Sequence, residues 1–483
     1  MTCALAIDVG SSSVRAAVYD TAGSEVGGSA ARSPYALEIR PDGSAVVDAD
    51  ALVALVTGCV DRALAANVAV DVVGVSCFWH SLVGVDSSRR AVTPLLTWAD
   101  TRADASARVL RESLDGAAVH ARTGAPLHAS YLPAKLHFIA TRQPETFARV
   151  DRWMSFAEYL FLALFGEPRC SLSMASATGL FDQATSQWDV ELCAAIGVDR
   201  ARLPVVSDAP VAGLGDSWAA RWPALAATPW LPAFGDGACA NIGSGCARRE
   251  QIGLTIGTSA ALRVVVDAGA AVGGAGLWRY SVDNRRSIVG GALNEGGGML
   301  AWLRDLLGSH GESTGDAAIA ALDPDTHGLT ILPFPGGERS PGWAAGARMT
   351  ISGLALNSRP VDILRATLES VAYRLKLIAD HLSSVVPPGS EVIGSGGALV
   401  SSPAWAAIIA DVLGRTVRLS TEPEPSCRGA ALLALERIGA IGDVADVQAG
   451  TGAEFAPDPA RHERYRTAVD RQQALYRTIV LTH

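Results

Sequence analysis

Lysine is nearly absent from this sequence of 483 residues, which contains only Lys135 and Lys376. Neither lysine follows a glycine, and a Walker A loop needs Gly-Lys to hold phosphate, so P-loop proteins are excluded. The Val-Ala-Ile-Lys strand of protein kinases and the Gly-x-Gly-x-x-Gly turn of dinucleotide-binding proteins are also missing. The sequence therefore lacks three widespread motifs for binding nucleotides.

Long apolar runs, paired cysteines and a basic charge balance are lacking as well. No run approaches the ~20 residues that cross a bilayer, and the N-terminal MTCALAIDVG has no basic region of a signal peptide. The eight cysteines form no Cys-x-x-Cys pair, so we expect them to be small buried hydrophobic residues. The net charge of -9 argues against a nucleic-acid partner. These absences predict a cytoplasmic protein with no membrane partner.

One pattern occurs twice, about half the chain length apart. Residues 7–20, IDVGSSSVRAAVYD, and residues 254–267, LTIGTSAALRVVVD, both read as a strand, a Gly–Ser/Thr–Ser turn, an arginine and a second strand. The matched positions are Asp8 with Thr255, Gly10 with Gly257, Ser11 with Thr258, Asp20 with Asp267 and, one residue out of step, Arg15 with Arg263. Because 483 residues exceed what one core usually organises, the repeat predicts two α/β domains, residues 1–246 and 247–483, each opening with a β-hairpin.

The two turns are candidate phosphate sites. A Gly–Ser/Thr–Ser turn presents backbone N–H groups and hydroxyls that can bind phosphate oxygens, although either turn alone could be an ordinary hairpin turn. Two facing turns would hold a polyphosphate from both sides. Asp8 ends an apolar run, where a carboxylate is costly to bury unless it meets a cation. A magnesium ion that carries the phosphates would supply that cation.

Periodicity places the other motifs. It predicts a strand at 72–77 that leads into Phe-Trp-His-Ser, and helices at 50–66, 103–114, 131–142 and 152–165. The strand end is a typical place for a ligand in an open α/β sheet. Asp236 stands between two glycines in FGDGACANIGSG, residues 234–245, at the start of a small-residue helix. It is either a helix N-cap or a general base beside a reacting hydroxyl.

Together these motifs resemble the FGGY carbohydrate kinases along nearly the whole chain. The matching segments are DVGSSSVR at 8–15, GDG at 235–237, IGTS at 256–259, GGALNEGGGMLAWLRD at 290–305, LPFPGGERSPGW at 332–343, ISGLALNSRPVDILRATLES at 351–370 and SGGALVSSPAW at 395–405. Two departures are Met349, where the family has a small residue, and YLPAKLHFI at 131–139, which lacks the usual tryptophan. The resemblance implies two actin-like (ribonuclease H-like) α/β domains that flank a deep cleft.

The resemblance also implies a role for particular residues. Asp236 would be the catalytic base next to the sugar hydroxyl, and Asp8 would be the carboxylate linked to Mg²⁺. ATP would be the phosphoryl donor. Its γ-phosphoryl group would pass to a sugar, with ATP held mainly by the second domain and the sugar by the first. The residues implied are Ser11, Ser12, Arg15, Gly257 and Thr258 for phosphate, Gly297, Gly396, Gly397 and Ala398 for adenosine, and Trp79, His80, Asp100 and Arg102 for the sugar.

Within the family, the sequence resembles gluconokinases more than xylulokinases. The segments HSLVGVD, PLLTWADTR and GDGACANIGSG carry this likeness. It implies transfer to the terminal 6-hydroxyl of D-gluconate, whose carboxylate would pair with Arg102 or Arg339; another pentulose or polyol substrate and a homodimer stay open. An actin-like ATPase without kinase activity is the alternative of another class, whereas a sugar-responsive repressor would carry a helix-turn-helix before the first phosphate turn, where none is expected.

Overall fold

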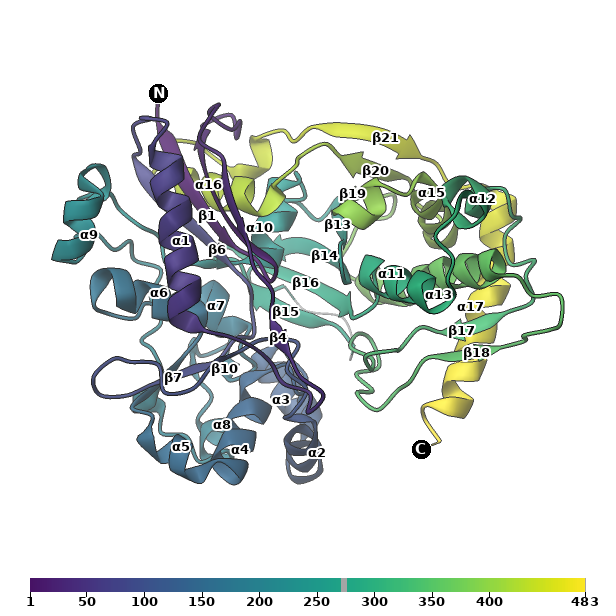
Figure 1. Ribbon diagram of the computed structural model, residues 1–483, viewed down its shortest axis with the longest axis horizontal. Coiled ribbons are helices and arrows are strands. Elements are labelled where there is room, and N and C mark those ends of the chain that lie inside the picture. The colour runs from purple at the N-terminus through teal and green to yellow at the C-terminus, as the bar shows by residue number, and fades with distance from the viewer. Residues whose placement is uncertain (271–275, 483) are drawn as a thin grey trace.

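Two β-sheets organise the chain in the computed structural model, which describes residues 1–270 and 276–482 (Figure 1). From edge to edge, the first sheet contains β12 (Phe234–Gly235), β6 (Val72–Cys77), β1 (Cys3–Val9), β2 (Ser13–Asp20) and β3 (Ala31–Pro34). The second contains β15 (Trp278–Ser281), β16 (Arg286–Leu293), β14 (Ala260–Asp267), β13 (Gln251–Ile256), β19 (Glu391–Ser395), β20 (Val417–Ser420) and β21 (Thr451–Phe455). The expected division after residue 246 falls between the last strand of the first sheet and the first strand of the second.

The two sheets repeat the same connections. β1 pairs antiparallel with β2 and parallel with β6, and β13 pairs antiparallel with β14 and parallel with β19. Asp8 lies opposite Arg15 in the first hairpin, and Gly253 lies opposite Arg263 in the second. The repeated β-hairpin predicted from the sequence is therefore confirmed.

Four small sheets lie outside the two central ones. They consist of β4 (Glu38–Ile39), β5 (Ala45–Val47) and β8 (Leu95–Leu96); β7 (Val83–Val85) and β9 (Arg152–Met154); β10 (Phe181–Asp182) and β11 (Gln187–Trp188); and β17 (Thr330–Leu332) and β18 (Thr350–Ser352).

Helices connect the strands, some covering the central sheets and others packing on one another. In the first half they are α1 (Ala49–Leu64), α2 (Asp104–Ser113), α3 (Gly116–Thr123), α4 (Leu132–Arg142), α5 (Pro144–Arg149), α6 (Phe156–Phe165), α7 (Leu172–Ser176), α8 (Val190–Ala195), α9 (Asp216–Arg221) and α10 (Asp236–Gly243). In the second half they are α11 (Gly297–Leu306), α12 (Asp316–Ala320), α13 (Pro360–Leu382), α14 (Gly397–Val400), α15 (Pro403–Leu413), α16 (Pro425–Arg437) and α17 (Pro459–Ile479). No helix of the described residues is long and apolar enough to span a bilayer.

The helices predicted near 50–66, 103–114 and 131–142 are confirmed within two residues. The prediction of a helix over 152–165 is wrong at its start, because residues 152–154 form β9 and pair with β7. Helix α6 begins after Ser155, whose side chain and that of Glu158 form a capping box. All eight cysteines are buried free thiols, as expected.

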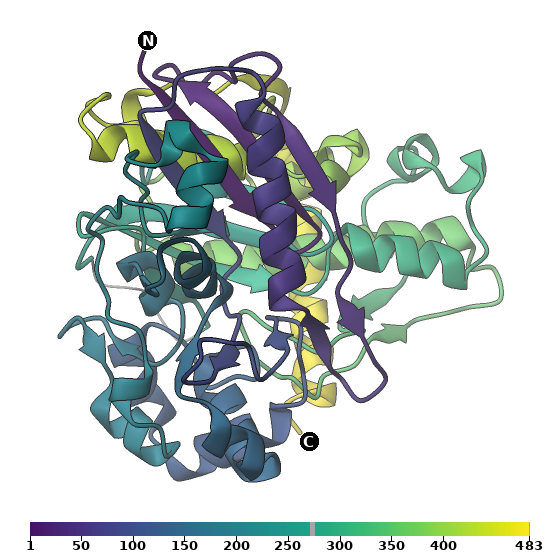
Figure 2. The same cartoon turned by 60° about the vertical axis from the view of Figure 1, so that its left-hand side comes forward.

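Helix α16 comes from near the C-terminus and packs into the core of the first sheet (Figure 2). It crosses α10 at two glycines. A Cβ on Gly243 would lie 1.8 Å from the carbonyl oxygen of Pro425, and one on Gly429 would lie 1.9 Å from that of Cys239. No side chain fits at either position, so the close crossing of α10 and α16 depends on both glycines.

We predict that Gly429→Ala destabilises the protein by about 1–3 kcal/mol, because the added methyl group must push α10 and α16 apart. Gly58→Ala is the matched control: Gly58 lies within α1, and a Cβ there would make only an ordinary contact, 3.7 Å from Arg62 Nη1, so alanine should stabilise the helix by up to about 1 kcal/mol. Urea denaturation measures both effects. Equal stability of the two variants would contradict the packing account.

Candidate active site

Asp8 lies where three strands meet. It is 2% exposed on β1, opposite Arg15 on β2 and Ser76 on β6. Arg15 Nη1 donates a hydrogen bond to Asp8 Oδ2 at 2.8 Å, and Ser76 Oγ donates one to Oδ1 at 2.7 Å. Burial raises the pKa of Asp8, while Arg15 and Ser76 act in the opposite direction. Arg15 also pairs with Glu424 at 2.8 Å, so its charge is compensated within the protein.

Asp236 is the first residue of α10 and directly follows β12. Its two flanking glycines make room for the indole of Trp79: a Cβ on Gly235 would lie 1.8 Å from Trp79 Cε2, and one on Gly237 would lie 2.6 Å from Cζ3. The N-cap residue is Gly235, so the N-cap interpretation of Asp236 is wrong. Trp79 itself donates its indole N–H to the carbonyl of Ser173 at 3.3 Å, and it lies beneath the Gly-Asp-Gly motif.

The environment of Asp236 makes its carboxylate a better proton acceptor than an ordinary aspartate. Burial raises the pKa of Asp236 to about 6, and the charge of Asp8 raises it as well. The charge of Arg263 and backbone hydrogen bonds from Gly237 and Trp79 lower it. A carboxyl group with this pKa is mostly ionised at pH 7, yet it binds a proton more readily than the usual aspartate with a pKa of about 3.9.

The two predicted phosphate turns lie at the tips of the two equivalent hairpins. In the first turn Ser12 is exposed and Ser11 is partly exposed. In the second, Thr258 is exposed and Gly257 accepts a hydrogen bond from the N–H of Gly297 at 2.7 Å. The second turn is therefore attached to the start of α11.

The glycines predicted for adenosine lie next to the second turn. Gly396 has a φ of 92°, and a Cβ there would lie 2.4 Å from the carbonyl of Ile256. A Cβ on Gly297 would lie 2.5 Å from the Cβ of Ala398. A cavity of about 480 Å³ opens here, with Gly297, Leu300, Ala301, Asp316, Ala398 and Ser402 among its lining residues. The structure thus brings Gly297 and Ala398 together at one cavity, and Gly257 is bonded to Gly297 beside it.

Two neutral histidines of opposite tautomer lie on the other side of the site. His80 Nδ1 donates to the carbonyl of Ala177 at 2.9 Å, which leaves Nε2 as an acceptor. His128 Nδ1 accepts from the N–H of Ser130 at 3.2 Å, which places the proton on Nε2 as a donor. Burial lowers the pKa of His80 well below its usual value and that of His128 to about 3. The pair offers one acceptor and one donor, which suits the hydroxyls of a polyol.

Aromatic side chains from both halves of the chain enclose these histidines. Tyr131 lies against His80, with ring centroids 4.8 Å apart, and its hydroxyl bonds that of Tyr280 at 2.6 Å. Trp343 lies against His128 at 5.3 Å. Because Tyr280 and Trp343 come from the second half, this part of the site is formed between the domains.

Asp100 and Arg102, both predicted sugar ligands, are paired with each other. Arg102 Nη2 donates to Asp100 Oδ2 at 2.6 Å, and Asp100 is 1% exposed. Lys135 is buried nearby and donates to the carbonyls of His80 and Thr97. Burial lowers the pKa of Lys135 to about 7. Lys135 thus connects the loop after β6 to the loop that carries Asp100.

Arg339 reaches the same region from the second domain without a charged partner. Its guanidinium lies over Trp98, 5.4 Å from the ring centroid, and its Nε has no hydrogen-bond partner. Its charge lowers the pKa of both His80 and His128. No carboxylate of the described residues forms an ion pair with it. The adjacent Glu338 pairs with Arg374 and accepts a hydrogen bond from the hydroxyl of Tyr476 at 2.6 Å. These buried contacts anchor the loop that carries Arg339 to the protein core.

Sequence reasoning gave no role to His128, Tyr131, Tyr280 or Arg263, all of which the structure brings to the site. His128 and Tyr131 precede α4, and Tyr280 lies on β15, so no local pattern connects them. Arg263 did carry a signal, because it occupies nearly the same place in the second hairpin as Arg15 in the first.

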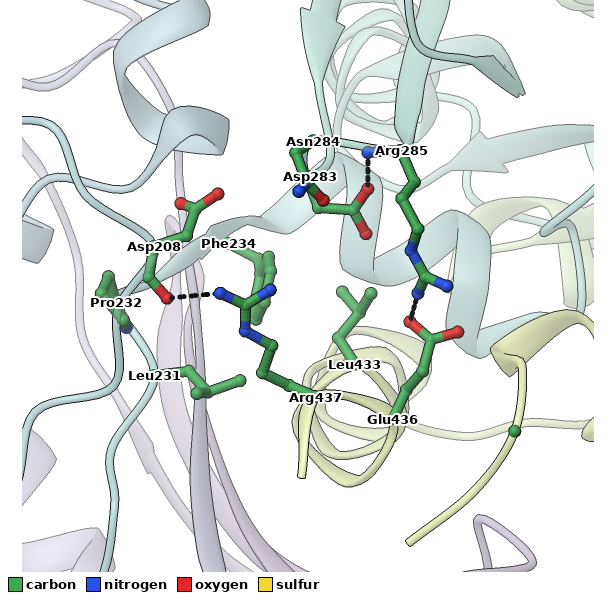
Figure 3. Close-up of a pocket in the computed structure, with 11 residues that line it drawn as sticks. Asp208, Leu231, Pro232, Phe234, Asp283, Asn284, Arg285, Leu433, Glu436 and Arg437 are labelled. Atoms are coloured by element: carbon green, nitrogen blue, oxygen red, sulfur yellow. Dashed lines mark hydrogen bonds and ion pairs between the residues drawn. The ribbon is translucent and has the colours of Figure 1, made fainter. Parts of the chain in front are cut away.

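A separate cavity of about 290 Å³ lies between the two halves, near Phe234 (Figure 3). Its polar groups are already engaged: Arg285 pairs with Glu436 at 2.5 Å, and Arg437 donates to the carbonyl of Asp208 at 3.3 Å. None of the predicted site residues lines it. Its paired charges join the turn before β16 to α16.

Comparison with known proteins finds relatives of similar sequence and similar fold. A gluconokinase of Bacillus subtilis is 28% identical over 403 residues, covering 80% of this chain and 79% of that protein. Two solved structures from Lactobacillus acidophilus, one described as a gluconate kinase and one as a ligand-bound xylulose kinase, each superpose with a TM-score of 0.90 at 23% identity, covering 99% of this chain and 98% of theirs.

The fold predicted from the sequence, two actin-like α/β domains, is confirmed by these superpositions. Residues 3–243 match the N-terminal domain of the FGGY family of carbohydrate kinases, and residues 254–436 match its C-terminal domain. The chain therefore belongs to the FGGY family and is a carbohydrate kinase.

Proposed function

We propose that this kinase transfers the γ-phosphoryl group of ATP to the terminal 6-hydroxyl of D-gluconate. The observation that carries the proposal is the uncompensated guanidinium of Arg339, which lies beside two neutral histidines. A sugar acid brings one negative charge and several hydroxyls. Its carboxylate would pair with Arg339, and its hydroxyls would bond His80 and His128.

Arg339 fits the carboxylate better than Arg102, the other arginine that the sequence leaves open. The guanidinium of Arg102 is already bonded to the buried Asp100, so a substrate would have to compete with that ion pair. Glu295 is a buried carboxyl without a hydrogen-bond partner; burial raises its pKa to about 8, although the charge of Arg339 acts in the opposite direction, so it is mostly neutral at pH 7. The carboxylate of gluconate would therefore compensate the charge of Arg339, for which the described residues provide no ion-pair partner.

Asp236 is the base in this proposal. As the substrate hydroxyl oxygen forms its bond to phosphorus, the hydroxyl proton passes to Asp236. The bond between the γ-phosphorus and the bridging oxygen breaks, and ADP leaves with that electron pair. The products are a phosphate monoester, ADP and a proton that Asp236 returns to solvent.

The phosphates of ATP would lie between the two turns, at Ser11, Ser12, Gly257 and Thr258. The cavity beside Gly297 and Ala398 would take the nucleoside, because those positions leave its wall without bulky side chains. Gly396 and Gly397 have no side chains, so the protein backbone at these positions could approach the ribose closely.

The residues present fit a magnesium ion. Asp8 and Asp236 are two acidic groups close enough that the charge of Asp8 raises the pKa of Asp236. Mg²⁺ keeps several waters and is usually held by one or two carboxylates plus phosphates, so this set suffices. Asp8 would hold the ion, which when bound neutralises phosphate charge.

A xylulokinase is the runner-up. A pentulose has no carboxylate and would leave Arg339 unpaired in a partly buried site, which is unfavourable. The test is ADP release with gluconate, D-glucitol, D-xylulose and glycerol, followed by identification of the phosphorylated carbon. We expect gluconate to give the highest kcat/KM and the 6-phosphate as product; a higher value for xylulose would refute the gluconate assignment.

The pH dependence tests the base. Because Asp236 must be ionised to accept a proton and burial raises its pKa to about 6, kcat/KM should be constant above that pH and fall as the pH drops through about 6. Asp236→Asn should lower kcat by on the order of 10²–10⁴ with little change in nucleotide affinity. An acid limb that persists unchanged in this variant would assign the titration to another group.

Asp8→Asn tests the metal site. The variant keeps one acceptor oxygen for Arg15, and its amide N–H can donate to the Ser76 hydroxyl. It loses the charge, so it should fold and need on the order of tenfold more Mg²⁺ for half-maximal rate. Magnesium titrations of the rate measure this. Superimposable curves for the variant and the parent would make Asp8 purely structural.

Arg339→Met tests the carboxylate partner. A bidentate charged hydrogen-bond pair contributes roughly 1.5–3 kcal/mol, so kcat/KM for gluconate should fall by on the order of tenfold to a hundredfold. The value for D-glucitol, which has the same carbon chain without the carboxylate, should change little. Equal losses for both compounds would indicate that Arg339 only supports the fold. Arg418→Met, a change on β20 that breaks exposed ion pairs, is the matched control.

A further inference from the structure

The two equivalent hairpins differ in how they compensate their arginines. In the first, Asp8 on β1 pairs with Arg15 on β2 and accepts from Ser76 on β6. In the second, Thr255 takes the place of Asp8, and its hydroxyl lies 3.1 Å from that of Ser395 on β19. The serine of the third strand is thus repeated, but the carboxylate is not.

Arg263 therefore keeps its positive charge. Its Nη1 lies 3.4 Å from Thr255 Oγ1, its Nε has no hydrogen-bond partner, and no carboxylate of the described residues forms an ion pair with it. Arg15, by contrast, pairs with two carboxylates, Asp8 and Glu424. Of the two hairpin arginines, only Arg263 is free to bind an anion.

Two glycines direct the side chain of Arg263 toward Asp236. A Cβ on Gly290 would lie 3.0 Å from Cα and Cγ of Arg263, and a Cβ on Gly237 would lie 3.1 Å from its Nε. The guanidinium is therefore next to the first turn of α10, the helix that begins with Asp236. Its charge acts on Asp236, although the two groups form no ion pair. A base and a cation from different domains thus lie near each other.

We infer that Arg263 is a catalytic residue that binds the equatorial oxygens of the phosphoryl group during its transfer. In that step the γ-phosphorus loses its bond to the bridging oxygen, which keeps the electron pair as ADP leaves. The substrate oxygen bonds the phosphorus and gives its proton to Asp236. In the transition state the negative charge is spread over the three equatorial oxygens, and a fixed guanidinium stabilises it. The inference rests on the phosphoryl transfer proposed above, but not on gluconate as the acceptor.

Two variants test the charge of Arg263, one by removing it and one by compensating it. Arg263→Met deletes the guanidinium and keeps an unbranched side chain between the two glycines. Thr255→Asp keeps Arg263 but recreates the ion pair of the first hairpin, with Ser395 in the position of Ser76 as the second partner. The matched control is Arg418→Met, on the outer part of the same sheet.

The measurements are kcat with whichever acceptor of the panel the parent uses best, the affinity for ADP, and the affinity for ADP with aluminium fluoride, a planar mimic of the phosphoryl group. We expect Arg263→Met to lower kcat by on the order of 10²–10³ and Thr255→Asp by at least about tenfold. Both should weaken binding of the mimic by a similar factor while ADP alone binds as in the parent. The control should match the parent throughout.

Other outcomes refute the inference in distinguishable ways. Parent-like kcat and mimic binding in Arg263→Met would exclude a role in transfer. Equal losses of ADP and mimic binding would make Arg263 a ground-state nucleotide ligand. If the parent prefers xylulose, the gluconate proposal fails, while the comparison of the variants on xylulose still decides the role of Arg263.

Discussion

The crossing of α10 and α16 is the constraint on which the site depends. Helix α16 is encoded nearly two hundred residues after α10, yet it enters the first core and meets α10 at Gly243 and Gly429, where no side chain fits. This contact fixes the axis of α10, and Asp236 is its first residue. Glu424, just before α16, also pairs with Arg15. One packing contact thus positions the proposed base and helps to compensate the arginine of the first hairpin.

Duplication with divergence explains the charges of the cleft. The two hairpins share their strand pairing and a serine on the third strand, but Thr255 replaces Asp8, and Arg263 lies opposite Gly253. Asp8 compensates Arg15, whereas Thr255 leaves Arg263 charged. Arg339 adds a second cation from the same domain. The first domain therefore contributes the acidic groups and the second contributes free cations, an arrangement suited to anionic reactants that bind between them.

The sequence predicts features that are local or repeated. The hairpins were predictable because strand and turn recur at a fixed offset with an arginine in nearly the same place, and α1 was predictable from its apolar periodicity. The need of Asp8 for a cation was also predictable, but Arg15 as that partner was not stated. The pairing of Asp100 with Arg102, the tautomers of His80 and His128, and the contact between Tyr131 and Tyr280 depend on segments brought together only by folding. No single-segment pattern reveals them.

We propose above all that the phosphoryl group in transfer lies between Asp236 of the first domain and Arg263 of the second. The carboxylate of the acceptor would then lie at Arg339. The most direct measurement is a crystal structure with ADP, aluminium fluoride, Mg²⁺ and D-gluconate bound. The account predicts the planar mimic within hydrogen-bond distance of the Arg263 guanidinium, the 6-hydroxyl at Asp236 and the carboxylate at Arg339. A mimic that Arg263 does not touch, with the carboxylate at Arg102 or in solvent, would contradict it.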